Sequence, residues 1–334
     1  MIVLGIETSC DETSASIVKD SKVLSNIVKT QSIHVEYGGV VPDLASKDHE
    51  KKILNVVNAS IKEAKIALSD VDAIAVTYGS GLLGSLIVGL NFAKGLSVGL
   101  GIPIIGISHL IGHLSSSFIN NKVNYPYLSL IVSGGHTQIW LIEAPDSYTV
   151  VSNTVDDAAG EAFDKGARIL GLNYPGGPEI EKKAINGNPE KYSFTIPEVK
   201  SNRFNFSFSG LKTALLYKKK ELDKTKEYSL ADLAASYQHA IIQSLLIKLV
   251  RVFKYYKVYN ISIVGGVSAN LYFRKNAEFL KEKYSLEIKF PDMEYCTDNA
   301  AMIAMAGYLK FKNNQFSKLD IEANPNIVYK SDVR

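Results

Sequence analysis

Two histidines stand four residues apart in the stretch HLIGH, at His109 and His113, directly after an apolar run. On a helix they would project from one face about one turn apart, which suits two ligands on a single ion. The zinc-protease pattern H-E-x-x-H is absent, because Leu110 stands where that motif has its general base. The pair is therefore a candidate metal site without metalloprotease chemistry. A satisfied, partly buried histidine, a helix-start cap and chance spacing are the simpler alternatives.

A third ligand must come from elsewhere in the chain. The segment YCTDNAAMIA offers Cys296 and Asp298 just before an expected helix. Asp298 is equally suited to cap that helix, and Cys296 to fill a hydrophobic gap. Two imidazoles and one carboxylate would leave coordination positions open for a substrate or water.

Three polar or glycine-rich turns follow expected strands, with the sequences ETSCDETS, VSGGHT and VGGVSAN. Glycine lets the backbone approach a phosphate, and hydroxyls and backbone N–H groups can donate to it. No G-x-x-x-x-G-K-[ST] loop occurs, and no G-x-G-x-x-G follows a first strand. One such turn would be ordinary hairpin chemistry, but three at strand ends favour binding of nucleotide phosphates.

Acidic residues accompany these turns. Asp11 and Glu12 could meet a metal ion, a water or a substrate amine, although an Asx turn would also explain Asp11. Asp164 lies on an expected helix one turn past Gly160, and the Gly176–Gly177 pair marks a tight turn before another helix. An aspartate facing a glycine turn could hold ribose hydroxyls.

The elements that must position these residues alternate between strands and helices. Strands are expected at 2–8, 14–19, 22–30, 72–79, 102–108, 149–156 and 260–270, with two more around a turn in 127–145. Helices are expected at 44–68, 84–100, 158–171, 229–256 and 298–309. Each half opens with strands around a polar turn, which predicts two related α/β domains facing each other. The lysine-rich stretch 218–226 is expected to be a solvated surface turn.

Length, charge and cysteine content limit the classes of protein to which this chain can belong. The 334 residues suit two domains, and 37 basic against 34 acidic residues give a formal charge of +3, which neither demands nor excludes nucleic acid. Two cysteines cannot build a disulfide framework. The start lacks the pattern of a signal peptide, and the apolar stretches are expected to be too interrupted to span a bilayer. We expect a soluble, cytoplasmic protein.

The chain resembles the TsaD family, the bacterial tRNA threonylcarbamoyladenosine transferases formerly described as O-sialoglycoprotein endopeptidases. The resemblance extends along the whole chain and is carried by GIETSCDETS, YGGVVPDLASKDH, H-x-x-x-H, VSGGHTQ, DDAAGEAFDKGARILGLNYPGGP, FSFSGLKTA, GGVSAN and YCTDNAAMIA. It implies the two-lobed actin-like ATPase fold of the acetate and sugar kinase, Hsp70 and actin superfamily, an α/β fold with a central nucleotide cleft. It places the N-terminal lobe at 1–125 plus 296–334 and the C-terminal lobe at 126–295.

The same resemblance implies an activity and its site. The activity is transfer of the threonylcarbamoyl group from threonylcarbamoyl-AMP to N6 of adenosine 37, next to the anticodon, in tRNAs that read codons beginning with A. The implied metal ligands are His109, His113 and Asp298, holding iron or zinc. The implied contacts to ATP or threonylcarbamoyl-AMP are Val132, Ser133, Gly134, Gly135, His136, Asp164, Gly177, Glu181 and Asn270. The implied partners are tRNA, a TsaB-like paralogue, a TsaE-like ATPase and a separate synthase that makes threonylcarbamoyl-AMP.

Three residues depart from the family pattern. Ile111 stands where the family usually has Glu, Ser80 where it has Pro, and Asp43 where it has Glu. None of them is an implied ligand. Ser80 is expected to make its loop more flexible, and the loss of a Glu at position 111 removes a possible partner of the metal ligands.

For the transfer, Asp11 or Glu12 is the candidate group that handles the N6 proton. Two other functions compete. A small-molecule kinase of the same superfamily would recruit Mg²⁺ through carboxylates rather than imidazoles, so the histidine pair disfavours it. A chaperone-like or scaffold ATPase would need the two lobes but not the metal.

Overall fold

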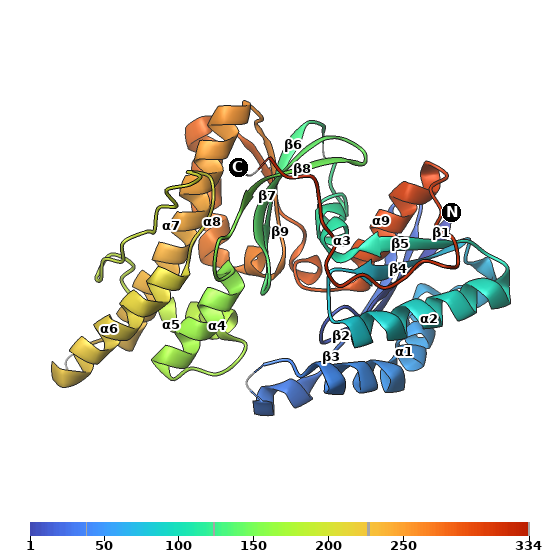
Figure 1. The fold of residues 1–334 in the computed structure, drawn as a ribbon, viewed down its shortest axis with the longest axis horizontal. Coiled ribbons are helices and arrows are strands. Elements are labelled where there is room, and N and C mark those ends of the chain that lie inside the picture. Colours follow the sequence, from blue (N-terminus) through green and yellow to red (C-terminus); the bar gives the residue numbers. More distant parts are fainter. Residues whose placement is uncertain (38, 123, 226–227, 333–334) are drawn as a thin grey trace. The chain divides into compact units, whose positions relative to one another are not determined.

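The computed structural model describes every residue except 38, 123, 226–227 and 333–334. The chain forms two compact units. Unit 1 combines Met1–Lys122 with Pro291–Val328, and unit 2 combines residues 123–290 with the end of the chain from Tyr329. Each unit contains one five-stranded mixed sheet with helices packed on it (Figure 1).

The sheet of unit 1 has the order β3-β2-β1-β4-β5. Its strands are β1 (Ile2–Glu7), β2 (Glu12–Lys19), β3 (Lys22–Thr30), β4 (Ala73–Gly79) and β5 (Ile104–Ser108). The first three are antiparallel neighbours, whereas β4 and β5 run parallel to β1. Every side chain of β1 is buried, so this strand is covered on both faces.

Helices cover both faces of that sheet. They are α1 (Pro42–Ala64), α2 (Leu83–Leu100), α3 (His109–Ser116) and α9 (Ala300–Lys312), with 3₁₀ turns η1 (Ser32–Tyr37), η2 (Leu68–Asp70) and η4 (Met293–Tyr295). Because side chains alternate along a strand, Leu4 and Ile6 join the core beneath α1 and α2, whereas Val3 joins the core with α9. The strand ends thus hold α3 and the start of α9 in fixed positions.

The sheet of unit 2 repeats the same topology, with the order β10-β9-β6-β7-β8. Its strands are β6 (Tyr127–Val132), β7 (Thr137–Ala144), β8 (Ser147–Asn153), β9 (Asn260–Val264) and β10 (Glu287–Lys289). Its helices are α4 (Ala159–Leu170), α5 (Gly176–Ala184), α6 (Ser209–Thr225), α7 (Leu230–Tyr256) and α8 (Leu271–Tyr284), with a 3₁₀ turn η3 (Gly266–Ala269). An antiparallel three-strand meander followed by two parallel strands occurs in both units, which confirms the predicted internal relationship.

Several predicted elements need correction. The stretch 218–226 is not a turn, because residues 218–225 belong to α6, where Lys219 pairs with Asp223 one helical turn away at 2.8 Å; residue 226 lies outside the described residues. Helix α1 ends at Ala64 rather than 68, since Lys65 adopts a positive φ of 55° and closes the helix. The Gly176–Gly177 pair opens α5 itself instead of preceding it.

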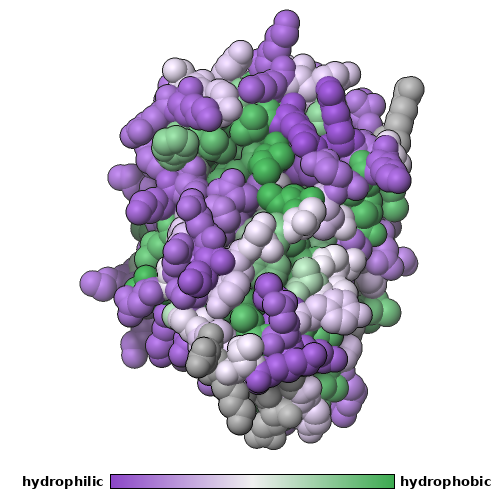
Figure 2. Space-filling view, turned by 90° about the vertical axis from the view of Figure 1, so that its left-hand side faces the viewer, coloured by the Kyte–Doolittle hydropathy of each residue, from purple (hydrophilic) through white to green (hydrophobic). Residues whose placement is uncertain are grey.

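The solvation expected for the lysine-rich stretch agrees with the surface of the molecule. Figure 2 shows a face that is mainly hydrophilic, with hydrophobic side chains in smaller patches between the polar ones. In α6 only Leu211 and Leu215 are buried, so most of this helix is in contact with solvent. The stretch is therefore solvated as expected, although it is helical.

In the described part of the chain, α2 is long and apolar enough to pass the length and composition test for a membrane span, contrary to the expectation from sequence. A third of it is buried, and its inner face, with Leu86, Leu90 and Ala93, packs in the core of unit 1. A core helix passes the same test, so this finding is weak evidence for a membrane.

Candidate metal centre and nucleotide-binding turns

The three candidate metal ligands converge within unit 1. His109 is the first residue of α3 directly after β5, His113 follows one turn later, and Asp298 lies just before α9. Asp298 Oδ1 is 3.1 Å from His113 Nε2 and 3.5 Å from His109 Nε2. One ligand atom from each residue lies within 4.8 Å of the others, close enough to share one ion.

Gly112 explains how α3 approaches α9 so closely. A Cβ at this position would lie 2.6 Å from Ile303 Cδ1 on α9 and 3.3 Å from Met302 Cγ. The glycine between the two histidines therefore allows the helices to pack together, which brings His113 to Asp298. Ile111 is half-buried, and nothing in the structure explains its identity.

The helix-cap alternative for Asp298 is wrong, because Asn299 caps α9 by accepting a hydrogen bond from Met302 N at 3.1 Å. Cys296 is fully buried and outside the cluster; its Sγ lies 3.5 Å from the carbonyl oxygen of Asp292. It therefore fills the hydrophobic role that the sequence left open. Asp298 is the carboxylate that meets the histidines.

His113 supplies the strongest sign that a ligand belongs here. Its side chain is fully buried, and neither ring nitrogen makes a hydrogen bond within the described residues; the 3.1 Å approach of Nε2 to Asp298 lacks hydrogen-bond geometry. A buried polar atom without a partner costs about 1–3 kcal/mol, so such atoms are rare unless a ligand satisfies them. Two imidazoles and a carboxylate are a donor set for iron, zinc or a similar divalent metal, and the residues present fit that group.

Glu7, at the end of β1, is a member of the site that the sequence did not indicate. Its carboxylate is fully buried and accepts hydrogen bonds from Ser9 N at 2.5 Å and Thr77 Oγ1 at 2.7 Å. Glu7 Oε2 also lies 3.2 Å from His109 Nδ1. No local sequence signal indicates the role of Glu7, because its histidine partner is 102 residues away and Glu7 itself matches the pattern of a strand end.

Charges at the centre shift the pKa values of two of these groups. Burial lowers the pKa of His109, but the carboxylates of Asp298 and Glu7 outweigh burial and raise it to about 9. Burial raises the pKa of Glu7, but His109 and Thr77 outweigh it and hold the pKa below its ordinary value. The centre therefore attracts positive charge, either as a proton on His109 or as a cation.

Of the predicted acids, Asp11 lies in the β1–β2 turn of unit 1 and Glu12 is the first residue of β2. Burial and the nearby carboxylates of Asp298 and Asp11 raise the pKa of Glu12 to about 10. The turn is held by His49 of α1, whose Nδ1 and Nε2 lie 2.8 Å from Thr13 Oγ1 and 2.9 Å from the carbonyl oxygen of Cys10. Glu12 is thus an acid in a fixed place close to the candidate metal ligands.

The nucleotide-binding residues predicted by resemblance all lie in unit 2, beginning with the β6–β7 turn. Ser133 N donates to the carbonyl oxygen of His136 at 2.8 Å, and His136 N donates to Ser133 Oγ at 3.2 Å. Gly160 N donates to the carbonyl oxygen of Ser133, and a Cβ on Gly160 would lie 2.6 Å from that oxygen. Gly134 and Gly135, at the tip, are exposed and have no atom within 4 Å of a Cβ. The turn is fixed at its base and open at its tip.

The other predicted contacts connect α4, α5 and α8. Asp164 Oδ1 accepts a hydrogen bond from Gly176 N at 2.7 Å, and Gly177 faces open space. Glu181 Oε1 accepts from Leu271 N at 2.6 Å, so this carboxylate is engaged with the start of α8. Asn270 caps α8 through Phe273 N. These side chains fix the starts of α5 and α8, and the N–H groups of Gly176, Leu271 and Phe273 are engaged by them.

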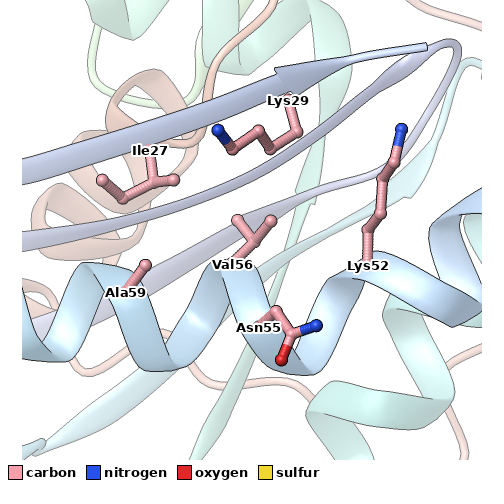
Figure 3. A pocket seen from close by; sticks show the side chains of 6 residues that line it. All are labelled: Ile27, Lys29, Lys52, Asn55, Val56 and Ala59. Carbon is pink, nitrogen blue, oxygen red and sulfur yellow. The ribbon is translucent and has the colours of Figure 1, made fainter.

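A separate pocket of about 260 Å³ lies between β3 and α1 (Figure 3). Ile27, Val56 and Ala59 form its apolar wall, and Lys29 and Lys52 border it. None of the predicted site residues lines it, so it belongs to neither candidate site.

The chain is an α/β protein of two units with an actin-like fold, and it carries a His-His-Asp cluster in unit 1 and the predicted glycine turns in unit 2. The family model of TsaD, tRNA N6-adenosine threonylcarbamoyltransferase, matches residues 22–305. The chain belongs to this family. It is therefore a transferase that forms threonylcarbamoyladenosine on tRNA, and the resemblance inferred from its motifs is confirmed.

Relatives and solved structures agree with this assignment. The tRNA N6-adenosine threonylcarbamoyltransferase of Thermosipho africanus is 50% identical to this chain, and the alignment covers 98% of this chain and 99% of the relative. The enzyme of the same name from Porphyromonas gingivalis is 44% identical, and the alignment covers 96% of each chain. Full-length HypF in its phosphate- and nucleotide-bound form matches 95% of this chain with a TM-score of 0.63 at 11% identity. The match spans about half of HypF (47%). Component A of (R)-2-hydroxyglutaryl-CoA dehydratase from Acidaminococcus fermentans matches 93% of this chain and 98% of its own, with a TM-score of 0.56 at 17% identity. These two likenesses concern the fold alone.

Proposed function

We propose that the two units divide the threonylcarbamoyl transfer between them, with unit 1 supplying the metal and the proton acceptor and unit 2 binding the nucleotide. The observation that carries this proposal is the convergence of His109, His113 and Asp298 around the unpartnered nitrogens of His113. The donor is threonylcarbamoyl-AMP and the acceptor is N6 of adenosine 37 in tRNAs that read codons beginning with A.

His109, His113 and Asp298 would hold one iron or zinc ion. When bound, such an ion supplies Lewis acidity for the phosphate or acyl oxygens of the donor. The three side chains leave coordination positions free for those oxygens. Their placement at the start of two packed helices keeps them rigid, which favours a precise orientation of the donor.

The turns of unit 2 would bind the AMP moiety of the donor, or ATP. The open tips at Gly134, Gly135 and Gly177 let phosphate oxygens approach backbone N–H groups. Asp164 uses Oδ1 on Gly176 N, so its second oxygen is the group we assign to a ribose hydroxyl. Val132, Ser133, His136 and Asn270 would shape the walls of this site, whereas Glu181 contributes by fixing the start of α8.

Glu12 is our choice for the group that receives the N6 proton, with Asp11 as its neighbour in the turn. The amine attacks the carbamoyl carbon, the bond from that carbon to the phosphate oxygen breaks, and AMP leaves with the electron pair. Glu12 must be ionised to accept the proton, and its pKa is raised first by burial and then by the negative charge of Asp298. Neutralising Asp298 would therefore help to ionise Glu12.

Besides tRNA, which the family requires, we propose the partners that the family resemblance implies. These are a TsaB-like paralogue, a TsaE-like ATPase and a synthase that delivers threonylcarbamoyl-AMP. A formal charge of only +3 supports this proposal, because a weakly basic chain benefits from basic surface on its partners when it binds tRNA.

The test is mass spectrometry of nucleosides from tRNA incubated with this protein, its partners and threonylcarbamoyl-AMP. We expect the wild type to form threonylcarbamoyladenosine, and His109→Ala to lose both the metal and the product. Full activity of metal-free protein would exclude the metal from the reaction.

A second variant isolates the acid. Glu12→Ala should fold, retain the metal and bind the nucleotide, yet form little product. Modification of tRNA at the wild-type rate by this variant would show that another group receives the proton, and Asp11→Ala would then be measured in the same assay.

A further inference from the structure

Glu7 makes contacts that determine which nitrogen of His109 can bind a metal. Its Oε1 is occupied by the backbone N–H of Ser9 at 2.5 Å, and its Oε2 accepts from Thr77 Oγ1 at 2.7 Å. The same Oε2 lies 3.2 Å from His109 Nδ1, and Ser9 Oγ lies 3.0 Å from that nitrogen. The serine hydroxyl can donate or accept, so Glu7 is the partner of Nδ1 that can only accept. Both side chains are nearly inaccessible to solvent, with Glu7 at 0% and His109 at 6% exposure, so water cannot replace these partners.

An ionised carboxylate only accepts hydrogen bonds, so the hydrogen between Glu7 and His109 must reside on Nδ1. The other ring nitrogen, Nε2, is the one that faces Asp298, at 3.5 Å. His113 also presents its Nε2 to the same oxygen. The two imidazoles therefore point equivalent nitrogens at one place.

We propose that Glu7 is a positioning residue that holds the hydrogen of His109 on Nδ1 and so keeps Nε2 available as the metal donor. This inference rests on the proposed metal site. Carboxylate–histidine pairs of this kind fix ring orientation and make the imidazole a better ligand. With the hydrogen held on Nδ1, the lone pair of Nε2 faces the site, and the ring would not need to turn to bind a metal.

The substitution Glu7→Gln tests this directly, because it is nearly isosteric but reverses one hydrogen bond. The N–H of Ser9 can only donate, so the oxygen of the new side-chain amide must take the place of Oε1. The amide NH₂ then occupies the place of Oε2 and donates to His109 Nδ1. Nδ1 becomes an acceptor, the hydrogen moves to Nε2, and the metal loses its donor.

Thr77→Val is the matched control. It removes the other partner of Oε2 while leaving the carboxylate in place for His109. A general loosening of the buried cluster would weaken metal binding in both variants, whereas control of the tautomer affects Glu7→Gln alone.

The experiment measures Zn²⁺ affinity by competition with a chromophoric chelator on the full chain, with circular dichroism to verify folding. We expect Glu7→Gln to weaken Zn²⁺ binding by about 10- to 100-fold and Thr77→Val by less than about 3-fold. His109→Ala should bind no Zn²⁺ in the same range. Equal affinities of Glu7→Gln and the wild type would overturn the role of Glu7 while leaving the metal site intact. Absence of Zn²⁺ binding by the wild type would instead refute the proposed metal site.

A second measurement needs no variant and so does not depend on whether Glu7→Gln folds. In ¹⁵N-histidine-labelled, Zn²⁺-loaded wild type, long-range ¹H–¹⁵N spectra should show His109 protonated at Nδ1, with Nε2 shifted by the metal. A hydrogen on Nε2 and metal on Nδ1 would overturn the inference.

Discussion

The two units place different chemistry on the same topology. In unit 1 the turn after the first strand carries Asp11 and leads directly into Glu12 at the start of β2, whereas the corresponding β6–β7 turn of unit 2 carries Gly134 and Gly135. The first is surrounded by buried side chains that come from distant parts of the chain. The second is exposed only at its tip, and besides backbone groups it carries the side chains of Ser133 and His136. One scaffold thus carries a charged centre made of side chains and a glycine turn that we propose as a phosphate cradle.

The two sites differ in the contacts that hold their groups in position. The charged centre depends on long-range contacts, such as Glu7 with His109 and His113 with Asp298, that hold charges in a buried place. The cradle depends on close backbone packing at its base, at Gly160, and free space at its tip. Substitutions should therefore act on charge in unit 1 and on steric fit in unit 2.

The largest expected effect is that of His113→Ala. This variant should lose the metal and reduce tRNA modification by about 1,000-fold or more, since Lewis acidity is worth several kcal/mol. Metal analysis and nucleoside mass spectrometry of the same preparation measure both. His34→Ala removes another buried histidine of unit 1, bonded to Gln31, and should keep the metal. Metal retention by His113→Ala would remove this residue from the site.

Gly160→Ala and Gly134→Ala form the next pair, in unit 2. Gly160→Ala puts a Cβ 2.6 Å from the carbonyl oxygen of Ser133. Because this clash distorts the base of the turn, we expect the free energy of unfolding to fall by about 1–3 kcal/mol and nucleotide binding to weaken about 10-fold. The second enters open space and should change stability by less than about 0.5 kcal/mol. Urea unfolding and calorimetric titration with ATP compare them. Equal effects would contradict a cradle that is packed at its base and open at its tip.

A third prediction concerns pH and the charge of the centre in chelated, metal-free protein. Because the pKa of Glu12 is raised from 4.5 to about 10, folding takes up a proton, and this stabilisation is lost as pH rises through about 10. The raised pKa of His109 acts in the same direction as pH rises from 6.5 through about 9. The unfolding temperature should therefore fall between pH 6 and pH 10, and less steeply in Glu12→Gln. Parallel curves for the two proteins would mean that Glu12 ionises normally in the folded state.

The smallest effect separates two neighbouring residues. Asn299→Ala removes the cap of α9 and should cost about 1 kcal/mol of stability without loss of the metal. Asp298→Asn should do the opposite, losing the metal with little change in helix stability. Thermal unfolding measures the stability of both variants, and metal analysis measures their metal content. Loss of the metal in Asn299→Ala but not in Asp298→Asn would contradict the assignment of Asp298 as the ligand and Asn299 as the helix cap.

Much of the fold could be predicted from the sequence, because strand alternation and helical periodicity are local signals. The stripes along α1 and α7 and the buried runs of β4 and β5 identified these elements to within a few residues. The failure at 218–226 has a physical reason: lysines indicate solvent exposure but not backbone shape, and in α6 they pair with acids one turn away.

The site was predicted less completely. The spacing of His109 and His113 indicated a ligand pair, the segment before α9 offered Cys296 or Asp298 as a third ligand, and the resemblance selected Asp298. Glu7 could not be predicted, because its role arises from contacts with Thr77 and His109 that exist only once the strands are assembled. Local patterns define elements, whereas buried charge networks depend on the tertiary fold.

The most direct test of the metal centre is X-ray absorption spectroscopy of the Zn²⁺-loaded protein, compared with Asp298→Ala. We expect two imidazole nitrogens at about 2.0–2.1 Å and oxygen ligands in the wild type, and one oxygen scatterer fewer or no bound zinc in the variant. A sulfur ligand from Cys10 or Cys296, or a zinc shell with fewer than two imidazoles, would contradict this expectation.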